Sequence, residues 1–175
     1  MLIILPVKIL LTGEMGSKSS EFFIFNIVIK NPKYKNLTEN DKKILKIASL
    51  FHDITKRESM IDKTHPIQSA FDVYHILDKL NIEENEKYKV YYIIKNHDWL
   101  EKYNTSENTK NTIKDIAFDL HKDNFFEMAS ILTEADLKSV TADNKFFKKF
   151  EQAYKTGIKN VNEAIFNIQK SSIYI

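Results

Sequence analysis

Apolar residues recur through most of this chain at the three- and four-residue spacing that is typical of amphipathic α-helices. The first clear helix starts at Thr38 and Asp41, which form an approximate capping box. We expect this helix to run to about Ile54. Its apolar face consists of Ile44, Ile47, Ala48 and Phe51.

The same spacing continues toward the C-terminus. We expect one helix that is capped by Thr64 or His65 and has Pro66 in its first turn, and another that starts near Glu84 and ends near His97. Beyond a polar loop at 104–108, further helices are predicted at about 113–120 and 125–136. The tail, about 144–170, is predicted to form two helices that are broken at Gly157, which would act as a C-cap.

Glycine is scarce in this chain. There are three glycines, and none of them lies between Ser17 and Thr156. Sheet-rich folds need frequent turn residues with positive φ, so we predict an all-α bundle of about six or seven helices. The same scarcity excludes a P-loop and a dinucleotide-binding fingerprint from the body of the chain. A length of 175 residues suits one domain.

The first 36 residues differ from the rest. Residues 2–11 are an apolar run, too short to span a bilayer, which needs about 20 apolar residues. They also lack the features of a signal peptide, so we expect a buried strand or a partner-facing segment there. The run 22–29 fits either a helix or a strand. We therefore treat 1–36 as an atypical segment, which could still belong to the same domain, and 37–175 as the helical domain.

Composition limits the function further. The chain has no cysteine, which excludes disulfides, a thiolate zinc site and a cysteine nucleophile, and which fits a cytoplasmic protein. A net charge of +2 does not indicate nucleic-acid binding. No membrane partner is expected, and the sequence leaves a homo-oligomer open.

The dyad His52-Asp53 closes the first apolar helix. Adjacent helical residues point about 100° apart, so they converge on one ion most easily at a helix end, where the backbone can turn. Mixed imidazole and carboxylate ligation suits Mn, Fe, Ni, Co or Zn, with Mg if carboxylates dominate. His65 and His97 lie at predicted helix termini and Asp136 near the end of a helix, and such ends can meet at one end of a bundle.

Two cations follow the dyad. Lys56 lies four residues after His52 and would share its face if the helix persists. Lys56 could neutralise phosphate oxygens as a point charge, and Arg57, the only arginine of the chain, could do so with two parallel hydrogen bonds. A metal would lower the pKa of its bound water from about 15.7 toward about 7, which makes attack on phosphorus feasible.

Four segments carry a resemblance to a known family: LFHDITK at 50–56, HPIQSA at 65–70, IIKNH at 93–97 and AD at 135–136. Over roughly residues 37–153 the chain resembles the HD-domain superfamily of metal-dependent phosphohydrolases. It looks closest to the HD domains that accompany nucleotidyltransferases. The resemblance implies an all-helical fold and one or two divalent metals. It also implies metal ligation by His52, Asp53 and Asp136, with His65 and His97 serving a second metal or the phosphate.

The chain departs from the family pattern at two places. Thr55 stands where the family usually has glycine. The family's first ligand is a histidine about 25 to 35 residues before the dyad, and this chain has no histidine before His52. Glu21 and Asn26 lie in that region and are candidate substitutes.

We therefore predict a metal-dependent phosphohydrolase that acts on a phosphomonoester or phosphodiester, with a nucleotide as the expected substrate. The predicted metal ligands are His52, Asp53, Asp136, His65 and His97. The predicted phosphate-binding residues are Lys56, Arg57, His65 and His97, of which Lys56 and Arg57 would act in catalysis together with Asp53. The alternative is a non-catalytic HD-like module that binds a nucleotide or a partner protein.

Overall fold

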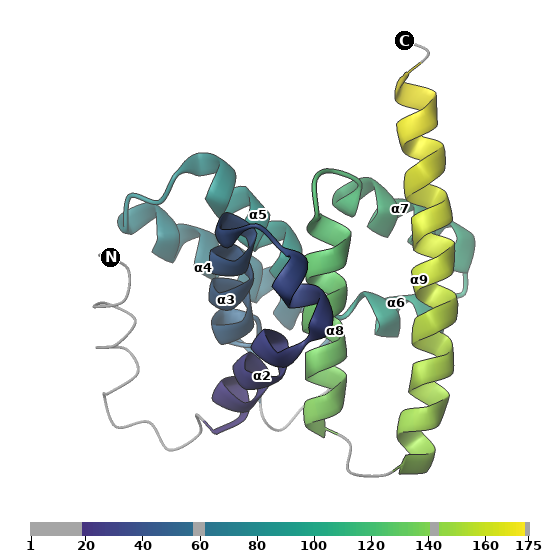
Figure 1. Cartoon of the computed structure of the whole chain (residues 1–175), viewed down its shortest axis with the longest axis horizontal. Helices are drawn as coiled ribbons and strands as arrows, with labels where there is room; N and C mark the ends of the chain where they lie inside the picture. The colour runs from purple at the N-terminus through teal and green to yellow at the C-terminus, as the bar shows by residue number, and fades with distance from the viewer. Residues whose placement is uncertain (1–18, 58–61, 141–143, 174–175) are drawn as a thin grey trace.

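Helices account for every regular element in the part of the chain that the structure describes, as the sequence predicts. The computed structural model describes residues 19–57, 62–140 and 144–173. Its α-helices are α2 (Ser19–Lys30), α3 (Glu39–Phe51), α4 (His65–Lys79), α5 (Glu84–Lys95), α6 (Trp99–Thr105), α7 (Thr109–Leu120), α8 (Phe125–Val140) and α9 (Asn144–Ser172), and the short 3-10 helix η1 (Pro32–Asn36) joins α2 to α3 (Figure 1).

Helix α8 lies at the centre of the bundle. It contacts α2, α3, α5, α7 and η1, so apolar residues cover most of its circumference. Met128, Ile131 and Leu132 have no exposed surface, and Ala129 is equally buried. Helix α3 packs between α2 and α5, and α5 pairs with α4 (Figure 1). The helices that carry the candidate metal ligands are therefore neighbours in one core.

The start of α3 follows the predicted capping box. The Thr38 hydroxyl accepts a hydrogen bond from the Asp41 amide at 3.1 Å and donates to the Asp41 carboxylate at 2.8 Å. The helix ends at Phe51, before the expected Ile54. The backbone tightens there, because the Ile54 amide donates to the Phe51 carbonyl at 3.2 Å, three residues back instead of four.

The run 22–29, which the sequence left open between helix and strand, lies within helix α2. Ile24 and Val28 are buried, and α2 packs against α3 and α8. The apolar run at 2–11 lies outside the described residues. Among the helices of the described part, none has the length and apolar character needed to cross a bilayer.

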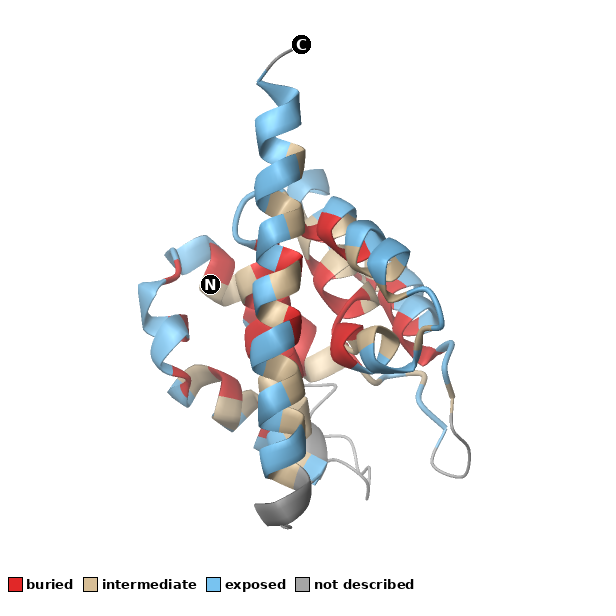
Figure 2. Cartoon of the chain, turned by 90° about the vertical axis from the view of Figure 1, so that its right-hand side faces the viewer, coloured by how far each residue is buried: buried red, intermediate tan, exposed pale blue. Residues whose placement is uncertain are grey.

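The prediction that Gly157 breaks the tail into two helices is wrong. Helix α9 runs without interruption past Gly157, and Figure 2 shows it along one side of the bundle. A Cβ atom at Gly157 would lie 2.6 Å from Trp99 Cζ3 and 2.9 Å from Cη2. Glycine is therefore needed for the close approach of α9 to α6, a short helix that the sequence pattern did not predict.

We expect Gly157→Ala to destabilise the protein. Alanine would gain up to about 1 kcal/mol of helix propensity over glycine. The added methyl group would collide with the fully buried Trp99 ring, and overpacking of this kind costs about 1–3 kcal/mol. Urea unfolding should show a lower midpoint for Gly157→Ala, whereas Lys155→Ala, at an exposed position of the same helix, should stay close to the unmodified chain. An equal or higher midpoint for Gly157→Ala would contradict this account of the packing.

Candidate metal centre

The five predicted ligands lie together: three histidines surround the Asp53 carboxylate, and Asp136 lies beside one of them. Asp53 Oδ1 is 3.0 Å from His65 Nε2 and 3.3 Å from His97 Nε2. Asp53 Oδ2 is 3.7 Å from His52 Nε2, which in turn is 3.8 Å from Asp136 Oδ1. Asp53 therefore offers one oxygen to a pair of histidines and the other to His52, with Asp136 beside it.

Helix ends supply most of these side chains. His52 is the C-cap of α3, and Asp53 lies in the turn that follows. His65 is the first residue of α4, and His97 comes two residues after the end of α5. Asp136 projects from the second half of α8. The turn after α3 frees Asp53 from helical geometry, so that its carboxylate can lie beside the adjacent imidazole.

Each of the three imidazoles is held by a backbone carbonyl three residues earlier. The Nδ1 atoms of His52, His65 and His97 lie 3.1 Å, 2.5 Å and 2.7 Å from the carbonyl oxygens of Ser49, Asp62 and Ile94. A carbonyl oxygen can only accept, so each Nδ1 carries a proton and donates it. In the neutral ring, Nε2 is then an unprotonated lone pair directed toward Asp53, which is the tautomer that a metal ligand requires.

With all three rings neutral, this arrangement leaves lone pairs that face one another without hydrogen atoms between them. His65 Nε2 and His97 Nε2 are only 3.4 Å apart. His52 Nε2 and Asp53 Oδ1 are buried atoms without a hydrogen-bond partner. Buried acceptors that face one another in this way are unfavourable unless a cation lies between them. The site is therefore arranged for a positive charge.

The spacing fits a divalent metal. Ligand atoms about 2.0–2.2 Å from a tetrahedral metal lie roughly 3.3–3.6 Å from one another. The four contacts among these side chains range from 3.0 Å to 3.8 Å. One ligand atom from each of His52, Asp53 and His97 also falls within 4.8 Å of the others. Imidazole and carboxylate donors together suit Mn, Fe, Ni, Co or Zn.

The carboxylates and imidazoles of this group shift one another's pKa values. Burial alone would raise the pKa of Asp53, but His65 and then His97 hold it well below its usual range. Burial alone would lower the pKa of His52, but Asp136 and then Asp53 raise it above its ordinary value. The pKa of Asp136 is lowered despite its burial, because His52 lies beside it. A proton and a metal ion would therefore compete for the same imidazole nitrogen.

The two predicted phosphate-binding cations differ in position. Helix α3 does not continue to Lys56, but the turn after it places the Lys56 ammonium 2.7 Å from Asp53 Oδ2. The Lys56 side chain remains 44% exposed. Arg57 is exposed and lies outside the five-residue group. Hydrogen bonds from Thr64 contribute most to lowering the pKa of Asp62, and the Arg57 charge contributes less.

The candidate substitutes for the missing first histidine both lie on α2. Asn26 is exposed, in contrast to the fully buried His52. The side chain of Glu21 lies outside the part of the structure that can be described.

Sequence reasoning missed the residues that hold this site in place. The Thr55 hydroxyl lies 2.9 Å from Ser69 Oγ and donates to the His65 carbonyl at 3.2 Å, which ties the turn after α3 to the start of α4. The Thr133 hydroxyl contacts both the His97 and the Ala129 carbonyls. Ser69 lies in the HPIQSA segment that carries the family resemblance, so the sequence could have indicated a role for it at the site. Thr133 had none, because its interhelical partner depends on how α8 approaches the end of α5.

Comparisons with known proteins place the chain in no family. No family model matches it, and neither a curated protein nor a solved structure does.

We expect Thr133→Val to destabilise the protein by about 1 kcal/mol, because it removes the hydroxyl that bridges α8 to the end of α5. Thr156→Val is a matched control, since the Thr156 hydroxyl makes the same intrahelical contact, to the Gln152 carbonyl, at an exposed position of α9. Urea midpoints of the two variants should therefore differ. Equal midpoints would show that the bond to the His97 carbonyl contributes nothing measurable.

Proposed function

We propose that this chain is a metal-dependent phosphohydrolase of the HD-domain type, which hydrolyses a phosphomonoester or phosphodiester with a nucleotide as the expected substrate. The observation that carries the proposal is the convergence of three imidazoles on Asp53, each fixed by a backbone carbonyl in the tautomer that leaves Nε2 unprotonated. Such fixed rings are typical of metal ligands. The resemblance in the four sequence segments supports the same class.

The residues divide into two sets that share Asp53. His52 lies on the Oδ2 side of its carboxylate with Asp136 beside the His52 ring, and His65 and His97 lie on the Oδ1 side. These five side chains would hold one or two divalent ions, with Asp53 as the common ligand. A divalent ion held there would supply Lewis-acid activation of a water molecule at neutral pH.

Beside these ligands, the protein supplies a positive charge at the solvent-exposed edge of the site. The ammonium of Lys56 lies beside the Asp53 carboxylate and is half exposed, so it is placed to neutralise a phosphate oxygen of a substrate that arrives from solvent. The side chains of Asp53 and Asp136 are 15% and 23% exposed, whereas His52 and His97 are fully enclosed. Substrate would therefore approach from the carboxylate side.

The metal-ligand role of His52 can be tested with a matched histidine. His121 also donates from Nδ1 to a carbonyl three residues earlier, at 2.6 Å from Phe118 O, but it lies outside the five-residue group. We expect the unmodified protein and His121→Ala to retain Mn²⁺ through gel filtration and to cleave bis-p-nitrophenyl phosphate. His52→Ala should lose roughly 100-fold in metal affinity, because it removes a ligand outright.

Metal content by mass spectrometry and thermal shift would be measured beside turnover. If the unmodified protein neither retains nor responds to Mn²⁺, Ni²⁺ or Fe²⁺, the proposal fails and the non-catalytic module becomes the better interpretation. Metal retention without turnover would leave a metal-binding module and would exclude hydrolysis of this substrate.

Lys56 is expected to act on substrate and not on the metal. Lys56→Met should lower kcat/KM for the phosphodiester by roughly 10²-fold, the scale of losing one group that stabilises transition-state charge. Its bound metal content should stay unchanged. Lys63→Met, at an exposed position before α4, is the control and should keep full activity. Loss of metal from Lys56→Met, or unchanged kcat/KM, would contradict this role.

A further inference from the structure

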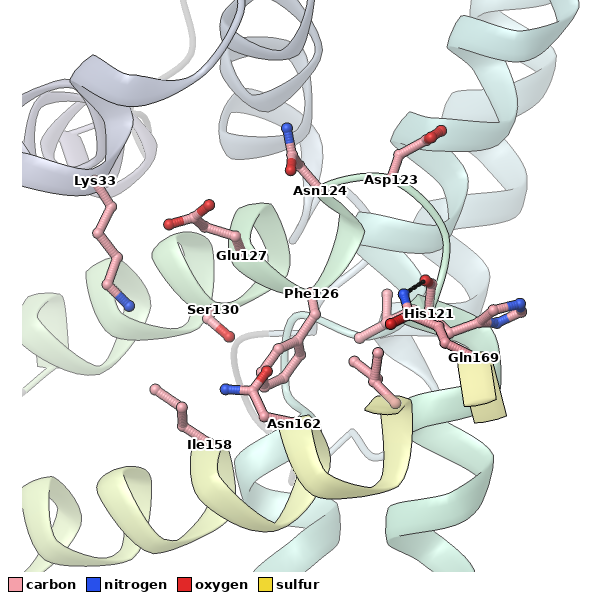
Figure 3. A pocket seen from close by; sticks show the side chains of 12 residues that line it. Lys33, His121, Asp123, Asn124, Phe126, Glu127, Ser130, Ile158, Asn162 and Gln169 are labelled. Carbon is pink, nitrogen blue, oxygen red and sulfur yellow. Dashed lines mark hydrogen bonds between the residues drawn. The ribbon is translucent and has the colours of Figure 1, made fainter. Parts of the chain in front are cut away.

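A second polar cavity, distinct from the metal centre, lies on another side of α8. It has a volume of about 320 Å³, and none of the five candidate ligands lines it. Its walls come from α8, from α9, from the turn between α7 and α8, and from Lys33 of η1 (Figure 3).

The side-chain hydroxyl of Ser130, which lines this cavity, has no hydrogen-bond partner among the described residues. The residue is only 2% exposed, and its hydroxyl oxygen is buried. A helical serine commonly bonds the carbonyl four residues earlier, as Thr133 does on the same helix. The backbone of Ser130 is satisfied, because its carbonyl accepts from the Tyr154 hydroxyl at 2.9 Å. Its side chain points into the cavity (Figure 3), which is favourable only if something there accepts or donates a hydrogen bond.

Three other polar side chains around Ser130 also have no hydrogen bond or ion pair within the described residues. They are the ammonium of Lys33, the carboxylate of Glu127 and the amide of Asn162. Figure 3 shows Lys33, Ser130 and Asn162 approaching one region from three elements, with Glu127 beside them. The opposite end differs, since Gln169 there donates to the His121 carbonyl at 3.2 Å. The free polar groups are thus gathered in one part of the cavity.

The charges define which ligand could satisfy these groups. Among the described lining residues, one free cation, Lys33, is balanced by the carboxylate of Glu127, whereas Asp123 is already paired with Lys89 at 3.6 Å, and this balance disfavours a phosphate or any other dianion. A molecule with both signs of charge would meet both free charged groups. Apolar side chains line the remainder, notably Phe126, Ile158 and Ile165. A volume of about 320 Å³ is at the lower end of the range for small-molecule sites, which suits a small ligand.

We propose that this cavity binds a small zwitterion with an apolar side chain, of the α-amino acid class. Its carboxylate would accept hydrogen bonds from the Lys33 ammonium and the Ser130 hydroxyl, and its ammonium would donate to Glu127. The Asn162 amide can serve either end, and the apolar wall receives the side chain. The site is independent of the metal centre, so it stands or fails separately from the phosphohydrolase.

Calorimetric titration of the full chain with L-leucine, L-methionine and L-phenylalanine tests the proposal. Saturable binding of at least one of them is expected, with a Kd below about 10 mM. N-acetyl-leucine lacks the ammonium and leucinamide lacks the carboxylate, so each should bind at least about tenfold more weakly than leucine, the scale of one lost charge-assisted contact. Inorganic phosphate should not bind in this cavity.

Substitutions of the proposed contact residues test whether the ligand binds in this cavity. Lys33→Met and Glu127→Gln should each weaken binding about tenfold, while Lys35→Met, an exposed lysine of the same 3-10 helix, should not. Ser130→Ala should weaken binding and leave the thermal midpoint unchanged or higher, because a buried unpaired hydroxyl is removed. The proposal is overturned if none of the three amino acids binds, if both derivatives bind as well as leucine, or if Lys33→Met and Glu127→Gln bind normally.

Discussion

The constraint on which this structure depends is the meeting of three imidazole nitrogens at the Asp53 carboxylate, whose Oδ1 atom is buried. His52, His65 and His97 each donate from Nδ1 to their own backbone, so a neutral ring has no second N–H group to donate to Asp53. Lone pairs that face each other in a low-dielectric interior repel unless a cation is present. The helix ends that carry them are held together by packing of the apolar core and by the bridges from Thr55 and Thr133.

Helix termini explain why this chemistry arises where it does. The last carbonyls of a helix have no intrahelical partner, and a histidine just beyond the end can donate to one of them. His52 and His97 do so after α3 and α5, and His121 does the same after α7. His121 shows that the local hydrogen bond alone makes no metal centre. Only the packing of α3 against α5 and α8, and of α4 against α5, turns such anchored rings toward one point.

The parts of the fold that follow from local chemistry were predictable. The Thr38 cap and the proline in the first turn of α4 depend on residues close in sequence. Helix α8, by contrast, continues to Val140, past the expected end at Asp136. The five candidate ligands were identified by residue type and position, although no local pattern shows that they converge. Gly157 was misinterpreted because its role depends on Trp99, 58 positions earlier in the chain. Helix α6 spans 7 residues, too short for a periodic pattern, and the unpaired Ser130 hydroxyl has no sequence signal at all.

Helix α8 separates the two proposed sites and belongs to both. Glu127 and Asp136 are nine residues apart, and at about 100° per residue their side chains leave the helix on opposite sides. Ser130 lies near the Glu127 face, whereas Thr133 lies nearer the Asp136 face. The apolar residues between them, among them Met128, Ile131 and Leu132, are fully buried, so the two faces of α8 are separated by core and not by solvent.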